Sequence, residues 1–228
     1  MLTKGGYSPL SINEVLQKYW GHTDFRPKQE EIIHAVMAGK DTLALLPTGG
    51  GKSVCFQVPA LAMGKLCLVV SPLIALMKDQ VEHLQKAGVA ARAITSGMSY
   101  PEMENVLESA AVGKLSFLYV SPERLGSELF EARLPRLPLG LIAIDEAHCI
   151  SQWGYDFRPA YLKIRLVRER VPNIPVLALT ASATSVVATD IMEKLAFRGP
   201  HMVRGSFLRP ELVLWTSQGD DKHGRLLR

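Results

Sequence analysis

Residues 45–53, LLPTGGGKS, constrain the fold more than any other stretch of this sequence. A short apolar run at 42–46 leads into the glycines, and SVCFQVPAL follows them with the apolar spacing of a helix. The glycines at 49–51 permit positive φ angles, so that successive N–H groups and the next helix N-terminus can bind phosphate oxygens. Leu46 replaces the first glycine of G-x-x-x-x-G-K-[ST]. The order strand, glycine loop, helix still predicts a nucleotide triphosphate site, against the alternative of a plain glycine turn.

This loop supplies a charge and a hydroxyl as well as its backbone. Lys52 is expected to neutralise oxygens of the β- and γ-phosphates, and Ser53 to offer its hydroxyl to Mg²⁺. The residues of the loop predicted to bind the nucleotide are Thr48, Gly49, Gly50, Gly51, Lys52 and Ser53.

The composition permits several partners without selecting one. With 228 residues, 47% of them hydrophobic, the chain can bury a sizeable core, and one α/β domain is favoured over two small ones. Its formal charge of +4 permits a polyanionic partner, although a bland basic surface gives the same charge. Cys55, Cys67 and Cys149 lie far apart, which favours reduced thiols over a disulfide framework or a zinc site. No membrane-length apolar run or secretory leader is present, so we expect a soluble cytosolic or nuclear protein with no membrane partner.

Apolar runs without alternation predict a mostly parallel sheet whose strands are buried on both faces. They lie at 42–46, 66–70, 90–94, 115–120, 139–144 and 176–180, with a further strand at 212–216. Helices are predicted at 10–19 after Ser11, from Pro27, at 103–111 and at 185–195. Such sheets bind ligands beyond the carboxyl ends of their strands, which is where Ser71, Thr95, Ser96 and Ser121 are expected.

A second strong pattern is LGLIAIDEAH, an apolar strand that ends in two carboxylates and a histidine. Asp145 stands where a Mg²⁺ ion bridging the triphosphate needs a second protein ligand, and Glu146 is placed to activate the attacking water. His148 is more often structural than catalytic in such a position. The phosphate loop and the acidic pair together predict a nucleotide hydrolase with Lys52, Asp145 and Glu146 as its catalytic residues.

The segment WGHTDFRPKQ precedes the glycine loop by about twenty residues. Gln29 has the donor and acceptor needed to bind an adenine edge, while Arg26 and His22 can stack on its faces. The alternative is that Trp20 and Phe25 belong to the core and that Gln29 is a solvated helix residue.

Aromatic residues follow the acidic pair in SQWGYDFRP, where Trp153, Tyr155 and Phe157 lie beside Arg158. Bases of single-stranded nucleic acid stack on such rings, and an arginine binds the phosphates between them. A loop folded against the protein is the competing interpretation. Farther along, hydroxyls at Thr180, Ser182 and Thr184 end another strand and can exchange partners between the nucleotide and a second ligand.

These segments, with VVSPLIALMKDQ, VSPERL and ALTASAT, occur in an order that closely resembles the RecQ family of superfamily 2 DNA helicases. DEAHCISQWGYDFRP is the most family-specific of them. The resemblance implies a RecA-like P-loop NTPase domain with helices on both faces of the sheet, ATP and Mg²⁺ as cofactors, and 3′–5′ unwinding of DNA in repair and recombination. It also implies DNA contact or coupling through Ser71, Gln80, Ser121, Arg124, Trp153, Phe157, Arg158, Thr180 and Thr184. His22 stands where the family often has another aromatic residue.

The resemblance divides the chain into a helical lead-in with the adenine segment (1–25), a first RecA-like domain (26–216) and the start of an interdomain linker (217–228). The family continues into a second RecA-like domain, whose arginine finger completes the ATP site and contributes about 10³ to 10⁵ in rate. We therefore expect these residues alone to hydrolyse ATP poorly and not to unwind DNA. The implied partners are single-stranded and partly duplex DNA and that second domain, in the bacterial cytoplasm on the nucleoid or in a eukaryotic nucleus.

Three other functions stay open from the residues alone. A DNA-independent P-loop ATPase or transporter motor would keep the nucleotide site, but its hydrolysis would not respond to Trp153→Ala. A noncatalytic nucleic-acid-binding module would not need Lys52. DEAH proteins also act on RNA, and the aromatic loop favours DNA only by resemblance.

Overall fold

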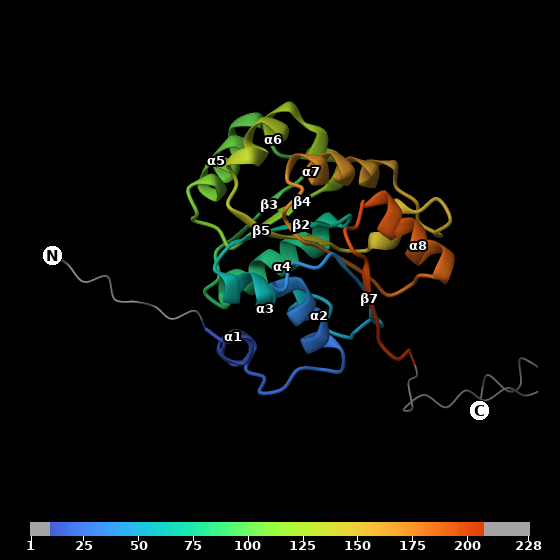
Figure 1. Cartoon of the computed structure of the whole chain (residues 1–228). Helices are drawn as coiled ribbons and strands as arrows, with labels where there is room; N and C mark the ends of the chain where they lie inside the picture. Colours follow the sequence, from blue (N-terminus) through green and yellow to red (C-terminus); the bar gives the residue numbers. More distant parts are fainter. Residues whose placement is uncertain (1–9, 208–228) are drawn as a thin grey trace, which may run out of the picture.

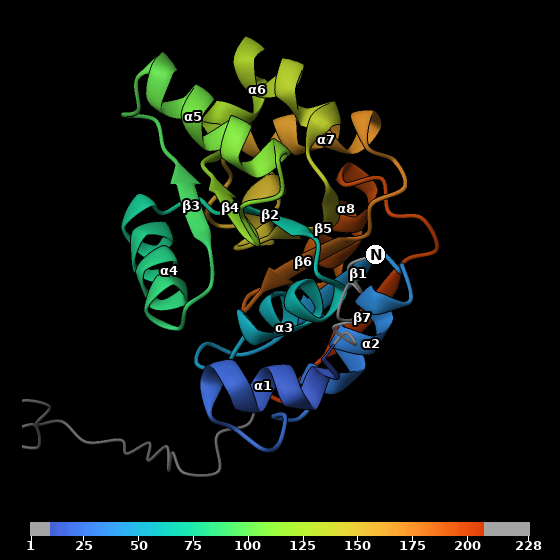
Figure 2. The ribbon, with the colours of Figure 1, turned by 90° about the vertical axis from the view of Figure 1, so that its left-hand side faces the viewer.

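Seven parallel strands form one sheet in the computed structural model, which describes residues 10–207. The strand order is β3-β4-β2-β5-β6-β1-β7, and every pair is parallel. Figure 1 shows the sheet between its helices, and Figure 2 labels all of its strands. The strands are β1 (Thr42–Leu45), β2 (Leu66–Val70), β3 (Ala91–Ile94), β4 (Phe117–Val120), β5 (Leu139–Ile144), β6 (Val176–Thr180) and β7 (His201–Arg204). The predicted α/β class with a parallel sheet is confirmed.

Helices cover both faces of this sheet, as Figure 2 shows. One face packs against α2 (Gln29–Met37), α3 (Val54–Met63) and α4 (Ile74–Lys86), and α1 (Ile12–Trp20) packs on the outer side of α2 and α3. The other face packs against α5 (Tyr100–Ala111), α6 (Glu128–Arg133), α7 (Ile164–Arg170) and α8 (Ser185–Lys194). Short 3₁₀ turns are η1 (Pro122–Gly126), η2 (Leu134–Arg136), η3 (Ala147–Ile150) and η4 (Pro159–Lys163).

Apolar and polar residues do not alternate along the strands, because each face of the sheet has its own hydrophobic core. In β1, Leu43 and Leu45 pack into the core beneath α5 to α8, while Ala44 packs into the core beneath α2 to α4. Successive side chains of a strand point to opposite faces, so both sets must be apolar when helices cover both faces. The apolar runs therefore indicate a central layer between two helical layers.

Local signals account for several element ends. Ser11 and Glu14 form a capping box at the start of α1, as the predicted cap at Ser11 requires. Helix α5 begins at Tyr100, three residues before its predicted start, because Ser99 and Glu102 form a second capping box. Helix α2 begins at Gln29 and not at Pro27, after a left-handed Lys28.

Other elements differ from the prediction or lie beyond it. Helix α7 and the edge strand β7 were not predicted, because α7 is only seven residues long and β7 is a short strand with one buried side chain. The segment that follows VS at the end of β4 forms the 3₁₀ turn η1. The predicted strand at 212–216 and the predicted linker lie outside the described residues. None of the helices within residues 10–207 is long and apolar enough to span a membrane.

A buried ion pair at the amino end of β1 joins segments that are distant in the sequence. Asp41, immediately before β1, is fully buried and pairs with Arg168 of α7, which is 4% exposed. The Asp41 carboxylate also accepts hydrogen bonds from the backbone N–H groups of Val176 (3.0 Å) and Arg198 (2.7 Å). It therefore connects β1, β6 and the segment leading to β7.

Asp41→Asn is expected to lower the free energy of unfolding by about 3 kcal/mol, because it leaves the buried Arg168 charge without its counterion. Urea unfolding followed by circular dichroism measures this. Glu82→Gln is the control, since Glu82 pairs with Lys86 on an exposed helix face and should change stability by less than about 1 kcal/mol. Equal effects of the two substitutions would contradict the structural role of Asp41.

Candidate nucleotide-binding and coupling site

The glycine loop lies between the end of β1 and the start of α3, the place predicted for it. Gly49 and Gly51 adopt φ angles of 78° and 70°, which other residues reach only with strain. A Cβ atom at Gly50 would lie 2.9 Å from the carbonyl oxygen of Pro47. All three glycines are therefore required by the backbone path of the loop.

Gln29 and Arg26 hold this loop in the structure. The Gln29 side-chain amide donates to the carbonyl oxygens of Gly51 (3.0 Å) and Gly50 (3.3 Å), and its Oε1 accepts from the Arg26 backbone N–H (2.8 Å). The Arg26 guanidinium donates to the Gly49 carbonyl oxygen. Gln29 is 3% exposed, so the alternative of a solvated helix residue is wrong. Phe25 does pack against the core, as that alternative held.

A cavity of about 170 Å³ lies beside these contacts. Its lining includes His22, Asp24, Arg26, Gln29 and Gly51, so the residues predicted to bind adenine lie together next to the phosphate loop. Both ends of the Gln29 amide already have protein partners. Binding of an adenine edge would therefore require Gln29 to exchange a loop contact for a base contact.

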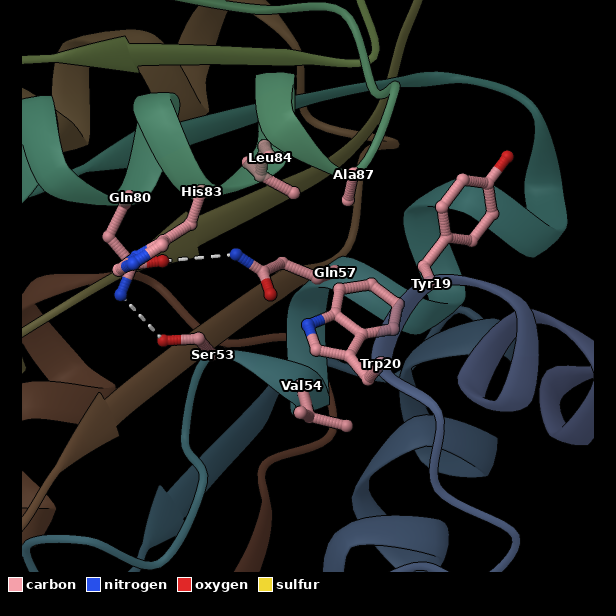
Figure 3. A pocket seen from close by; sticks show the side chains of 9 residues that line it. All are labelled: Tyr19, Trp20, Ser53, Val54, Gln57, Gln80, His83, Leu84 and Ala87. Carbon is pink, nitrogen blue, oxygen red and sulfur yellow. Dashed lines mark hydrogen bonds between the residues drawn. The ribbon is translucent and has the colours of Figure 1, made fainter.

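Ser53 belongs to a chain of side-chain hydrogen bonds that the sequence did not reveal. Gln80 of α4 donates from Nε2 to Ser53 Oγ (3.0 Å) and accepts through Oε1 from Gln57 Nε2 (3.0 Å). Figure 3 shows these hydrogen bonds beside a cavity of about 430 Å³, whose lining includes both glutamines and Trp20. Gln80 was predicted to contact DNA by resemblance; its side chain here contacts the predicted Mg²⁺ ligand. One sequence feature could have indicated this hydrogen-bonded chain: Gln57 is a polar residue within the mainly apolar stretch SVCFQVPAL.

The acidic pair lies at the carboxyl end of β5. The Asp145 N–H donates to the Val70 carbonyl oxygen (2.8 Å), and the Tyr161 hydroxyl donates to the Asp145 carbonyl oxygen (2.9 Å). Burial, followed by the neighbouring Glu146 charge, raises the pKa of Asp145, whereas the Lys52 charge lowers it. Lys52 and Asp145 are thus close enough to interact electrostatically, as joint binding of a metal–triphosphate requires.

Glu146 has left-handed backbone angles, with φ and ψ both 47°, at the start of the η3 turn. Such a conformation is uncommon for a residue other than glycine and is maintained by the surrounding structure. It directs the chain into η3, where His148 follows. Glu146 Oε2 lies 3.3 Å from Nδ1 of His148.

His148 connects the acidic pair to the end of β6. Its Nδ1 lies 2.8 Å from Oγ1 of the buried Thr180, and Thr180 Oγ1 also accepts from the Ser182 N–H (3.2 Å). Burial lowers the pKa of His148 and so favours the neutral ring. Thr184 caps α8 by accepting from the Val187 N–H (3.3 Å). The predicted hydroxyl cluster therefore lies next to the acidic pair through His148.

The aromatic loop at 151–158 extends from this connection to the surface. Trp153 and Tyr155 are 74% and 79% exposed, so the alternative of a folded-under loop is wrong for both rings. The Tyr155 ring stacks on His148 with centroids 4.9 Å apart. Phe157 is half-buried beneath Lys194, and the Arg158 guanidinium donates to the Pro72 carbonyl oxygen (3.3 Å). Tyr155, which the sequence analysis named only as one of the aromatic residues of the loop, provides the contact between loop and histidine.

The remaining residues predicted to contact DNA lie at the same sheet edge but mostly below the surface. Ser71 and Ser121 are 2% and 1% exposed. The Arg124 guanidinium donates to the carbonyl oxygens of three residues after β3, Thr95 (3.0 Å), Ser96 (2.5 Å) and Met98 (2.7 Å). Arg124 thus braces a loop, and DNA contact by all three residues stays a prediction.

A parallel sheet with a glycine loop after β1 and an acidic pair at the end of β5, which β6 separates from β1, defines a RecA-like P-loop domain. Comparisons with known proteins agree with this class and identify a family within it. A model described as "DEAD/DEAH box helicase" matches residues 26–190, and the chain belongs to that family.

Within the family, RecQ helicases of several species are 42–43% identical to this chain. The ATP-dependent DNA helicase RecQ of Pasteurella multocida (strain Pm70) is 43% identical over 199 residues, which are 87% of this chain and 32% of that protein. The putative ATP-dependent RNA helicase R290 of Acanthamoeba polyphaga mimivirus is 42% identical over 205 residues, 89% of this chain and 37% of that protein. The chain spans about a third of the length of these relatives.

A solved structure also matches the fold. The crystal structure of the DUF1998 helicase MrfA bound to DNA superposes with a TM-score of 0.68 at 18% identity, covering 85% of this chain and 29% of that one. At this identity the likeness shows the fold alone.

Proposed function

We propose that this chain is the first motor domain of a RecQ-like, ATP-dependent DNA helicase. The observation that supports it most is a continuous set of contacts from the acidic pair to the exposed aromatic loop. Glu146 lies beside His148, His148 stacks on Tyr155, and Trp153 of the same loop is exposed for a base. Nucleotide hydrolysis and strand binding would thereby influence each other.

The residues present suit a magnesium–ATP complex. The Ser53 hydroxyl and the Asp145 carboxylate offer the oxygen ligands that Mg²⁺ prefers, and the charge of Lys52 suits the β- and γ-phosphates. The bound metal would neutralise charge that develops on the transferred phosphoryl group. Glu146 would orient the attacking water and accept its proton.

His148 would connect changes at the nucleotide site to the aromatic loop at 151–158. Its Nδ1 contacts Thr180 and Glu146, so a change in the Glu146 partner would alter the hydrogen bonds of the imidazole. Tyr155 stacks on that ring, and its hydroxyl oxygen accepts a hydrogen bond from the Ser182 hydroxyl (3.3 Å). The loop would therefore shift with hydrolysis, which is the coupling that a translocating motor needs.

The finer parts of the proposal rest on the resemblance. They are 3′–5′ direction, a role in DNA repair and recombination, a linker from residue 217 to a second RecA-like domain, and weak hydrolysis without that domain. We place the protein on the bacterial nucleoid in the cytoplasm or in a eukaryotic nucleus. An RNA substrate is the second candidate, favoured by the similarity to the mimivirus protein named as a putative RNA helicase.

Trp153→Ala is expected to weaken binding of single-stranded DNA by about 5- to 150-fold, because a stacked base contributes about 1–3 kcal/mol. Fluorescence anisotropy of a labelled oligonucleotide measures this, and an RNA of the same sequence distinguishes the two substrates. Tyr100→Ala is the matched control, since Tyr100 is 62% exposed at the start of α5. Unchanged DNA affinity in Trp153→Ala would exclude the loop as the strand-binding element, and tighter binding of RNA would favour the second candidate.

A further inference from the structure

Three side chains of metal-binding types converge beneath the aromatic loop. They are His148, Cys149 and Asp156, and one ligand atom of each lies within 4.8 Å of the others. The Cys149 sulfur lies 3.8 Å from His148 Nε2 and 3.6 Å from an Asp156 carboxylate oxygen. In a tetrahedral site with zinc–ligand distances of about 2.0–2.3 Å, ligand atoms lie roughly 3.3–3.8 Å apart, so two of these separations need little adjustment.

The backbone brings the three residues together. Cys149 lies within the 3₁₀ turn η3, where its N–H donates to the Glu146 carbonyl oxygen (2.9 Å). The Arg158 N–H then donates back to the Cys149 carbonyl oxygen (2.8 Å), which closes the loop on itself. The loop thereby brings Asp156 back beside Cys149, seven positions earlier in the sequence. The wide spacing of the cysteines predicted that the chain has no zinc site. Sequence spacing alone does not reveal that the loop folds back on itself and brings these three side chains together.

His148 is already oriented as a metal ligand. Its Nδ1 faces Thr180 Oγ1 at 2.8 Å and Glu146 Oε2 at 3.3 Å, so both acceptors favour a proton on Nδ1. The Nε2 lone pair then points toward Cys149. Histidine ligands of zinc characteristically donate their other N–H to such a partner, which fixes tautomer and ring orientation.

We propose that His148, Cys149 and Asp156 form a site for a Zn²⁺-class transition metal, with a water molecule as fourth ligand. Sulfur and imidazole ligands favour such a metal over Mg²⁺, which prefers an all-oxygen octahedral site. Asp156, whose side chain is 42% exposed, provides the entry from solvent. Arg158 donates at 3.0 and 3.3 Å to Oδ2 of Asp156, the same oxygen that lies near Cys149, so metal binding requires the carboxylate to turn its other oxygen toward Arg158.

Metal binding would release one proton from Cys149 and would restrain the aromatic loop. Burial raises the pKa of the Cys149 thiol to about 12, so the free protein carries the protonated form. A metal–sulfur bond replaces the S–H bond, and that proton goes to solvent. Two of the ligands, Cys149 and Asp156, flank Trp153 in sequence, so the metal would tie the loop to His148 and restrain it. The site stands without the proposed helicase function, since its residues need no nucleotide or DNA.

Cobalt absorption titration of the whole chain, without nucleotide, tests the site. Co²⁺ is expected to produce a sulfur-to-cobalt charge-transfer band that saturates at one equivalent and that equimolar Zn²⁺ removes, whereas excess Mg²⁺ leaves it unchanged. Cys149→Ser should abolish the band. Cys55→Ala and Cys67→Ala are the matched controls, because both thiols are buried in the apolar core and should leave it intact.

Asp156→Asn provides a second test at a position less critical for folding. It should keep the band, because Cys149 remains, but weaken Co²⁺ binding by at least about 10-fold. Circular dichroism establishes that each variant is folded. No charge-transfer band in the folded wild-type chain, or a band that survives Cys149→Ser, would overturn the proposal.

Discussion

Lys52→Ala is expected to weaken binding of a magnesium–ATP analogue by at least about 10²-fold. Lys52 is the positive charge of the glycine loop, and that charge lowers the pKa of Asp145, against the larger effect of burial. Without it, the loop offers only N–H groups to a highly charged triphosphate. Isothermal titration calorimetry with a non-hydrolysable ATP analogue measures the change.

Lys86→Ala is the matched control for this substitution. Lys86→Ala removes the same charge from an exposed position in α4, where Lys86 pairs with Glu82. The variant should bind nucleotide within about twofold of the wild type, since exposed ion pairs contribute little. Equal affinity of Lys52→Ala and Lys86→Ala would show that the glycine loop is a structural turn and not a phosphate site.

Glu146→Gln is expected to slow ATP hydrolysis by about 10²- to 10⁴-fold while nucleotide affinity stays near that of the wild type. The amide keeps the size of the carboxylate but cannot accept a proton from the attacking water. Single-turnover reactions with protein in excess over labelled ATP, with single-stranded DNA present, measure the rate even if turnover is slow. The rate of Lys52→Ala defines the background.

Glu169→Gln is the control for Glu146, because Glu169 pairs with Arg165 on an exposed face of α7. Its hydrolysis rate should equal that of the wild type. Since Glu146 also lies beside His148, loss of nucleotide binding together with hydrolysis in Glu146→Gln would point to a structural role. A rate like that of the wild type would exclude Glu146 as the residue that activates water.

The elements that carry the site could be predicted because their signals are local. The glycines around residue 50, the carboxylates that end β5 and the cap at Ser11 each depend on a few consecutive residues. The same is true of the apolar strands, whose burial on both faces leaves a continuous run in the sequence. Fold class and the position of the phosphate loop followed from these patterns.

The contacts that join those elements could not be predicted in this way. Gln80 meets Ser53 across 27 residues, and Arg168 meets Asp41 across 127. Such pairs depend on how helices cross the sheet, and no local pattern distinguishes a glutamine that binds DNA from one that binds a loop serine. Asp156 and Cys149 are close in sequence, but their contact depends on the return of an irregular loop.

The most direct test of coupling is fluorescence titration of the chain with a labelled ATP analogue and Mg²⁺, in the presence and absence of saturating single-stranded DNA. Contacts through His148 and Tyr155 predict one saturable, magnesium-dependent site whose nucleotide affinity changes when DNA is added, and a loss of that change in Trp153→Ala. The same nucleotide affinity with and without DNA would contradict coupling within this domain.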